Sequence, residues 1–296
     1  MYYNNNSLVF YDGKWIKAKS AKANIFSQSM HYGNGVFEGI RSYKTPDGTQ
    51  IFKAKEHYRR LLFSAKKMHI NLEYTPEELT EITYQLLKKN NLSNAYIRPL
   101  VFLGENMTLT PTIESHLVIM AWEWERYLGN NLLNVTVSPY LRPHPQSCHV
   151  EAKVVGHYTN SILATTEAKS RGFDEALLLD HMGFVAEGPG TNFFYEKDEK
   201  LYTAPAGNIL PGITRATIIQ LAQQTGIKVI EKHFTIDEVK DADTAFFCGT
   251  ASEVVGIKSI DDVTFKAPWQ DSVGYSMLLM YKHKVTNKEF QDFILV

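Results

Sequence analysis

Apolar segments with the length of β-strands alternate along this sequence with segments of helical periodicity, and this alternation limits the fold more than any other feature. Helical spacing of apolar side chains extends over residues 55–70, and residues 75–78 (TPEE) combine the N-cap, first-turn proline and capping-box glutamate of a helix start. Strands interspersed with helices are typical of α/β or α+β proteins. The strand-like segments include QIFKA (50–54), NAYIRPLVFLG (94–104), HLVIMAWEW (116–124), EALLLD (175–180), NFFYEK (192–197) and TAFFCG (244–249).

The length of the chain favours two domains. Its 296 residues are many for one compact core and suit two α/β lobes. Residues 126–131 (RYLGNN) mix charge, glycine and asparagine between apolar segments, and we interpret them as an inter-domain linker. We therefore expect a small N-terminal α/β domain at residues 1–125 and a large C-terminal domain at residues 132–296.

Composition and charge exclude several classes of protein. Hydrophobic residues make up 44% of the chain and charged residues 21%, as in ordinary soluble globular proteins. The 31 Lys and Arg residues balance 32 Asp and Glu residues without a basic run, so nucleic acid is not an expected partner. No signal peptide and no apolar stretch of roughly 20 residues is seen, so no membrane association is expected. Cys148 and Cys248 lie outside any CxxC motif, which favours a reducing, cytoplasmic location.

Common catalytic and ligand-binding motifs are missing from the sequence. Neither GxGxxG nor GxxxxGK[ST] occurs, so the two usual nucleotide-binding fingerprints are absent. The ten histidines show no HExxH spacing, and we assign no metal site. No serine lies in a GxSxG elbow.

Two ionisable residues stand in unusual surroundings. Lys153 lies in VEAKVVGHY, and an apolar setting disfavours the ammonium form of a lysine; the neutral amine is the form that attacks an aldehyde. Glu187 lies in FVAEGPGTNFF, where the following glycine and proline indicate a tight turn at a strand end. A carboxylate there could hold a proton on a pyridine nitrogen. A solvent-reaching lysine and a hydrated turn glutamate are the structural alternatives.

Two segments have the features of anion-binding sites. Residues 211–214 (PGIT) open a predicted helix, so the amides of Ile213 and Thr214 lack intrahelical acceptors. Residues 249–252 (GTAS) end an apolar strand with small residues that expose amides and hydroxyls. Either segment could equally be an ordinary cap. A helical guanidinium could also bind a phosphate, and the pattern alone does not separate Arg60 from its neighbour Arg59.

Taken together, these segments resemble the fold type IV PLP-dependent aminotransferases and, within them, the branched-chain aminotransferases. The matches occur in the family's order and span most of the chain. The resemblance implies a two-domain α/β (α+β) fold with the active site between the domains and pyridoxal 5′-phosphate (PLP) held mainly by the large C-terminal domain. The matching segments are HYGNGVFEGIR (31–41), EHYRRL (56–61), AYIRPL (95–100), EAKVVGHY (151–158), EGPGTNFF (187–194), LPGITR (210–215) and GTASE (249–253).

The resemblance implies specific contacts with the cofactor. Lys153 would be the catalytic lysine, which carries PLP covalently and transfers the substrate proton. Glu187 would pair with the pyridine nitrogen, and Tyr158 would hydrogen-bond the phenolic oxygen. The phosphate would be bound by Arg60, Ile213, Thr214 and Thr250.

The resemblance also implies a substrate site. Tyr96, with the amides of Thr250 and Ala251, would bind the α-carboxylate, and Arg98 would receive the distal carboxylate of glutamate. The apolar pocket for a leucine, isoleucine or valine side chain would be formed by aromatic residues. These are Phe37, Tyr32, Tyr158 and Trp124.

The implied activity is ping-pong transamination of L-leucine, L-isoleucine and L-valine with 2-oxoglutarate. The implied ligands are amino acids and 2-oxo acids. The resemblance also implies a homodimer or a higher assembly. Three features differ from the family's usual pattern: His157 in the lysine motif, Pro189 and Thr191 in EGPGTN, and GENMTLTPT (104–112) in place of a glycine-rich loop.

Other readings remain alternatives. On the same fold they are a D-amino-acid aminotransferase, an amine transaminase and aminodeoxychorismate lyase, against which AYIRPL argues. A catalytically silent PLP-binding scaffold is opposed by the retained Lys153 and Glu187. The last alternative is an unrelated α/β protein with accidental matches.

Overall fold

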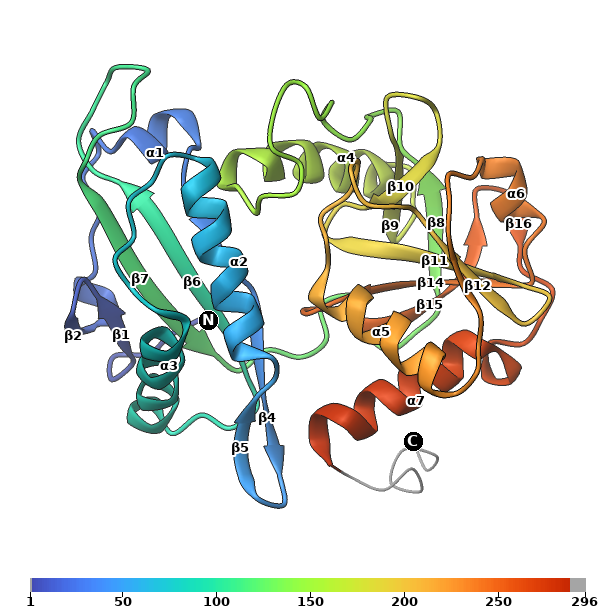
Figure 1. The fold of residues 1–296 in the computed structure, drawn as a ribbon, viewed down its shortest axis with the longest axis horizontal. Coiled ribbons are helices and arrows are strands. Elements are labelled where there is room, and N and C mark those ends of the chain that lie inside the picture. The colour runs from blue at the N-terminus through green and yellow to red at the C-terminus, as the bar shows by residue number, and fades with distance from the viewer. Residues whose placement is uncertain (1, 288–296) are drawn as a thin grey trace. The chain divides into compact units, whose positions relative to one another are not determined.

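The computed structural model describes residues 2–287, and these form two compact units (Figure 1). Unit 1 comprises the described part of residues 1–125 together with Ala152–His157; unit 2 comprises Arg126–Glu151 and the described residues from Tyr158 onward. Residue 1 and residues 288–296, which belong to the expected domain ranges, lie outside the described residues. The expected linker at residues 126–131 is grouped with unit 2.

Unit 1 contains a mixed set of helices and strands. Its described strands form a seven-stranded sheet in the order β2-β1-β7-β6-β4-β5, with β3 paired to β6. The elements are β1 (Leu8–Tyr11), β2 (Lys14–Lys17), the 3₁₀-helix η1 (Ala18–Ser20), α1 (Gln28–Tyr32), β3 (Val36–Phe37), β4 (Ile40–Thr45), β5 (Gly48–Ile51), α2 (Ala54–Lys67), α3 (Pro76–Asn90), β6 (Ala95–Leu103) and β7 (Ser115–Trp122).

Local sequence signals explain several of these elements. Asp12 and Gly13 both adopt positive φ, 45° and 79°, as the tight turn between β1 and β2 requires. The predicted capping box at the start of α3 is confirmed, because Thr75 accepts from the Glu78 amide and the Glu78 side chain accepts from the Thr75 amide. Tyr58 on α2 and Leu79 on α3 are among the fully buried side chains that join these helices to the core of the sheet.

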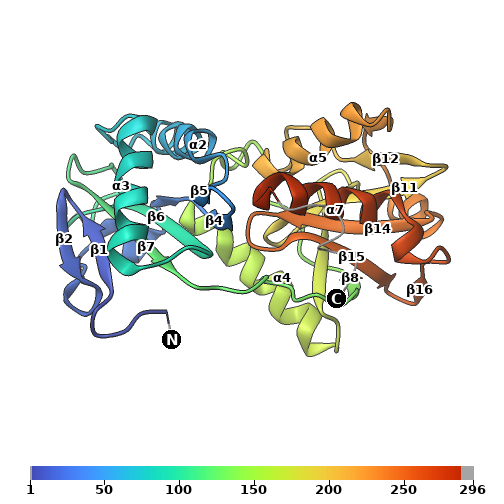
Figure 2. The same ribbon diagram turned by 90° about the horizontal axis from the view of Figure 1, so that it is seen from below.

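The remaining described elements belong to unit 2, apart from the 3₁₀-helix η2, which lies in unit 1. Helix α4 contacts β9, and α5 and α7 pack together near β14 and β15 (Figure 2). The elements are β8 (Leu133–Val137), η2 (Val155–His157, in the segment grouped with unit 1), α4 (Tyr158–Ser170), β9 (Glu175–Leu179), β10 (Val185–Gly188), β11 (Thr191–Lys197), β12 (Lys200–Thr203), α5 (Ile213–Gln224), β13 (Val229–Glu231), α6 (Ile236–Lys240), β14 (Thr244–Gly249), β15 (Glu253–Ile260), β16 (Val263–Thr264), η3 (Trp269–Asp271) and α7 (Val273–Thr286).

Six of the described strands of unit 2 close into a barrel. They pair in the order β10-β9-β8-β15-β14-β11, and β11 pairs back with β10. The closing contact brings Glu187 opposite Asn192 and Gly188 opposite Thr191. Closure removes exposed strand edges at this point and gives the Glu187 side chain a fixed cross-strand neighbour.

Strand β15 was not identified in the sequence, although it is central to the barrel. It contains Gly256, and a Cβ there would lie 2.6 Å from both Leu132 Cδ2 and Trp269 Cδ2. The glycine that weakens the strand pattern is therefore required by close packing in the folded unit. Among the described residues, no helix combines the length and the apolar character needed to cross a lipid bilayer.

Candidate active site

The main chain of Lys153 is fixed on both sides within unit 1. Its amide donates to Ser64 Oγ on α2 at 2.9 Å, and its carbonyl accepts from the Phe37 amide at 3.1 Å. The neighbouring Val155 amide donates to the Gly35 carbonyl at 2.8 Å. These contacts explain why Ala152–His157 groups with unit 1, and they hold the lysine next to β3.

Two glycines allow this close approach. Gly156 donates its amide to the Gly33 carbonyl at 2.8 Å. Gly33 has φ 69°, and a Cβ on it would lie 2.9 Å from the Gly156 Cα. A side chain at Gly33 would therefore be strained and would push the two segments apart. This one crossing explains Gly33 of HYGNG and Gly156 of VVGHY.

The Lys153 amine and the Arg98 guanidinium both lie near Phe37. Lys153 Nζ lies 4.8 Å from the centroid of the Phe37 ring, and Arg98 Cζ lies 4.6 Å from the same centroid. Arg98 also lies 5.3 Å from the Tyr96 ring and donates from Nη2 to the Tyr96 hydroxyl at 3.0 Å. The Arg98 Nε is buried and makes no hydrogen bond within residues 2–287. Arg98 therefore retains a donor for a further acceptor.

The position of the Tyr96 side chain requires a glycine at residue 39, between β3 and β4. A Cβ on Gly39 would lie 2.2 Å from the Tyr96 hydroxyl oxygen, so only glycine leaves room for this group. Tyr96 is 4% exposed, and Trp124 meets its ring edge-on at 4.8 Å between centroids. Strand β7 ends at Trp122, so Trp124 lies beyond the strand that was predicted to contain it. Tyr96, Arg98, Phe37, Trp124 and Lys153 form the unit 1 part of the predicted site.

Arg60 is distinguished from Arg59 by its neighbours. Arg59 is exposed, whereas Arg60 lies against Glu38, with Nε donating to Oε1 at 2.6 Å and Nη2 to Oε2 at 3.0 Å. Oε2 of Glu38 also lies 2.7 Å from Nδ1 of His57. Burial alone would raise the pKa of Glu38, but the charge of Arg60 and the contacts with His57 hold that pKa well below its ordinary value. Glu38 and His57 were missed in the sequence, although both lie in the matching motifs.

Tyr32 is placed differently from the other predicted aromatic residues. It ends α1, is 47% exposed, and donates its hydroxyl to the Met107 carbonyl at 3.1 Å. The Gln28 side chain donates to the carbonyls of Thr108 and Thr110 at 2.7 and 2.9 Å. The loop at residues 104–112 is therefore attached to α1 at several points.

In unit 2, Glu187 is the acceptor of a buried polar network. Glu187 is 4% exposed, and its carboxylate lies 2.9 Å from Nε of Arg142. Asn192 donates from Nδ2 to Oε2 at 3.0 Å, and the Leu210 amide donates to Oε1 at 3.1 Å. This network fixes the position of the carboxylate. Arg142 was missed, because it lies in a loop without a pattern that separates it from other surface arginines.

Helix α5 begins without a side-chain cap beside this network. Its N-cap is Gly212, which offers no side-chain cap, and Thr214 is 3% exposed. A Cβ on Gly212 would lie 1.9 Å from Asn192 Oδ1. Because the N-cap lacks a side chain, the first amides of α5, including that of Ile213, are available to an anion.

The segment that follows β14 is tied to the start of unit 2. The Ala251 carbonyl accepts from the Tyr127 amide at 3.0 Å, and Glu253 Oε2 lies 3.3 Å from Nη2 of Arg126. Thr250 and Ala251 lie in the turn between β14 and β15, with both residues half-buried. Tyr158 is the first residue of α4. Unit 2 thus positions Glu187, the start of α5 and the Thr250–Ala251 turn.

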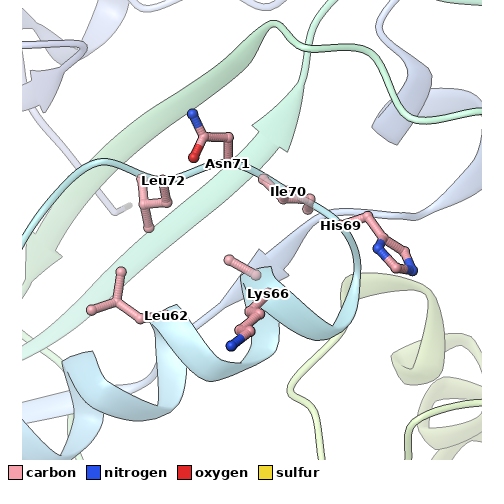
Figure 3. Close-up of a pocket in the computed structure, with 7 residues that line it drawn as sticks. Leu62, Lys66, His69, Ile70, Asn71 and Leu72 are labelled. Carbon is pink, nitrogen blue, oxygen red and sulfur yellow. The ribbon is translucent and has the colours of Figure 1, made fainter.

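The pocket shown in Figure 3 is separate from these residues. It lies at the C-terminal end of α2, and none of the predicted site residues lines it. Its lining side chains are mostly apolar, and within residues 2–287 its polar ones include no buried group without a partner. They are Leu62, Ala65, Lys66, His69, Ile70, Asn71 and Leu72.

Comparison with known proteins identifies the class. The family model described as amino-transferase class IV matches residues 35–260, about three-quarters of the chain. The chain belongs to the class IV aminotransferases.

Within this class, the following similar proteins are branched-chain aminotransferases. The chain is 44% identical over 262 residues to a branched-chain-amino-acid aminotransferase of Pseudomonas aeruginosa, covering 86% of this chain and 85% of the relative. The crystal structure of the Escherichia coli branched-chain amino acid aminotransferase matches with a TM-score of 0.92 at 33% identity, covering 95% of both chains. The branched-chain amino acid aminotransferase from Thermobaculum terrenum in its PLP form matches with a TM-score of 0.90 at 29% identity, covering 97% of this chain and 96% of that one. The predicted membership of the fold type IV branched-chain aminotransferases is confirmed.

Proposed function

We propose that this protein is a branched-chain-amino-acid aminotransferase that transfers the amino group of L-leucine, L-isoleucine or L-valine to 2-oxoglutarate with PLP as cofactor. One observation carries the proposal beyond family membership. The Phe37 ring lies 4.8 Å from Lys153 Nζ and 4.6 Å from Arg98 Cζ, so a reactive amine and a carboxylate-binding cation lie beside one apolar surface. Such a site suits substrates that alternate between an apolar and an acidic side chain.

The residues present fit PLP. The buried Glu187 carboxylate, held by Arg142 and Asn192, suits a protonated pyridine nitrogen. The uncapped first turn of α5, which starts at Ile213, suits a phosphate. We assign phosphate contacts to Ile213 and Thr214, with further contacts from Arg60 and Thr250, and a hydrogen bond to the phenolic oxygen to Tyr158.

PLP supplies an electron sink for the negative charge that develops at the substrate Cα. Lys153 would hold PLP through its side-chain amine and, as a free amine, would take the proton from the substrate Cα and deliver a proton back to the cofactor. Glu187 would hold a proton on the pyridine nitrogen, and Arg142 holds the Glu187 carboxylate in place.

The same residues position both substrates. Tyr96 and the amides of Thr250 and Ala251 bind the α-carboxylate. Arg98, whose Nε makes no hydrogen bond within the described part of the chain, binds the distal carboxylate of glutamate. The aromatic side chains of Phe37, Tyr32, Tyr158 and Trp124 surround the branched side chain, whose burial favours apolar substrates.

We also propose that the protein acts as a homodimer or a higher assembly. Two segments of unit 1, joined by the hydrogen bonds from Gln28 and Tyr32, expose large apolar side chains that suit contact with a second copy. The exposed side chains are Ile25, Phe26, Met30, Met107, Leu109 and Ile113. Light scattering coupled to size exclusion measures the assembly state, and Leu109→Glu should shift it toward monomer. The two free cysteines support a cytoplasmic location.

A spectroscopic titration tests the proposed activity. The purified protein should show the yellow absorbance band of lysine-bound PLP, which fades with L-leucine and returns with 2-oxoglutarate. Lys153→Ala should lose the band and steady turnover. A band that responds only to a D-amino acid or to an amine would reassign the substrate, and a band that responds to no amine donor would indicate a silent scaffold.

A further inference from the structure

Three charged or ionisable side chains meet inside unit 1 at the end of β3. Glu38 follows that strand, and His57 and Arg60 lie one turn apart on α2. The side chains of Glu38 and His57 are 0% and 1% exposed, and that of Arg60 is 11% exposed. Buried charges of this kind are costly unless each one is paired and hydrogen-bonded.

The Glu38 carboxylate satisfies this condition with four donors. Arg60 donates from Nε and Nη2 at 2.6 and 3.0 Å, and the Gly39 amide donates to Oε2 at 3.1 Å. The carboxylate is ionised and can only accept, so His57 must carry its proton on Nδ1, which lies 2.7 Å from Oε2. Burial lowers the pKa of His57 despite the neighbouring carboxylate, and the ring is therefore neutral.

The geometry fixes the orientation of the Arg60 guanidinium. Glu38 binds it along one edge, the edge that carries Nε and Nη2. The Glu38 main chain is itself held, because its amide donates to the Pro99 carbonyl of β6 at 2.9 Å. A planar guanidinium held by two parallel hydrogen bonds has little freedom to rotate, so its remaining donors point in a defined direction.

We infer that Glu38, held in place by His57, is the positioning residue that orients Arg60 and thereby gives the protein its preference for a phosphorylated over an unphosphorylated cofactor. The inference rests on the proposed function, in which Arg60 contacts the PLP phosphate. An arginine that is already oriented loses less conformational freedom when it binds a phosphate. A structural role for Glu38 alone would support the fold but would not discriminate between the two cofactors.

Glu38→Gln is the informative change because it keeps the volume of the side chain. Three donors surround Oε2, so the glutamine oxygen should occupy that position. The glutamine NH₂ group would then face Arg60 Nε, where the carboxylate accepted at 2.6 Å. Two donors repel each other at that distance, and Arg60 must turn away.

The experiment measures dissociation constants of PLP and of pyridoxal for the full-length apoprotein by absorbance titration. The ratio of the two constants reports recognition of the phosphate, whereas general damage to the fold weakens both ligands together. Glu38→Gln should reduce the preference for PLP by about 10- to 100-fold and leave pyridoxal affinity within about 3-fold, as expected for the loss of an oriented charge-assisted contact. An unchanged or increased preference for PLP would overturn the inference.

Control variants separate positioning from stability. Glu175→Gln removes another buried carboxylate, which Thr165 contacts at 2.8 Å in unit 2, and should leave the ratio unchanged. His57→Asn retains a donor near the position of Nδ1 and should keep most of the preference, whereas His57→Leu should lower it. If Glu38→Gln does not fold, His57→Asn and His57→Leu are compared instead. Equal ratios of the pyridoxal and PLP dissociation constants in these two variants would overturn the inference.

Arg60→Gln separates the phosphate role of Arg60 from the positioning role of Glu38. If that variant keeps the preference for PLP, the phosphate role of Arg60 in the proposed function is wrong. If it loses the preference while Glu38→Gln retains it, the proposed function stands and the positioning role of Glu38 is wrong.

Discussion

Replacing Gly39 with alanine should disturb the substrate site through a single steric contact. The added Cβ would lie 2.2 Å from the Tyr96 hydroxyl oxygen and 3.0 Å from Tyr96 Cζ. An ordinary contact between a carbon and an oxygen requires more than about 3 Å, so the hydroxyl must move by about 1 Å. That movement would break the 3.0 Å hydrogen bond from Arg98.

The size of the effect follows from how closely Tyr96 is packed. The ring is 4% exposed and lies 4.8 Å from Trp124 and 5.3 Å from Trp122 between centroids, so it has little space to move. Overpacking of this kind costs about 1–3 kcal/mol of unfolding free energy. If Tyr96 binds the substrate carboxylate, a misplacement of about 1 Å should raise the KM for L-leucine by roughly 10-fold or more.

A double-mutant cycle with Tyr96→Phe tests the reasoning. Removing the hydroxyl leaves Tyr96 Cζ, 3.0 Å from the new Cβ, as the nearest side-chain atom, which needs to yield by only a few tenths of an ångström. Urea unfolding of the apoproteins should therefore show Gly39→Ala costing about 1 kcal/mol less in the Tyr96→Phe background. Equal costs in both backgrounds would refute the steric explanation. An unchanged KM for L-leucine in Gly39→Ala would separately reject Tyr96 as the carboxylate ligand.

Three further changes test other parts of the site. Arg98→Met removes the guanidinium and keeps an apolar chain. The KM for 2-oxoglutarate should therefore rise by about 100-fold, while the rate of the half-reaction with L-leucine changes by about 3-fold at most. Stopped-flow absorbance measures both half-reactions, and equal losses would contradict the role of Arg98. Gly212→Ala places a Cβ 1.9 Å from Asn192 Oδ1, and the displaced amide should weaken PLP binding by about 10-fold in an absorbance titration. Unaltered affinity would show that the helix start tolerates a side chain. Glu187→Gln should retain PLP yet slow release of the Cα proton by about 100-fold, measured by exchange with deuterated solvent; a normal exchange rate would assign ring protonation to another group.

Much of the local structure could be predicted from the sequence. The capping box at Thr75 and the helix start at residues 211–214 depend on neighbouring residues, and each was found where predicted. The missed strand β15 shows the limit of such patterns. Its central Gly256 weakens the strand signal, and the packing of Trp269 that requires the glycine is visible only in the fold.

The sequence by itself determined the family and the candidate residues Lys153 and Glu187, because their motifs consist of contiguous residues. Tertiary structure decided which groups surround them. The pairing of Arg60 with Glu38 joins residues that lie 22 positions apart in the chain. The pairing of Glu187 with Arg142 likewise depends on how the barrel of unit 2 closes. Such contacts join segments that are distant in the chain, so no local periodicity records them; they arise only when burial forces each charged group to find a partner.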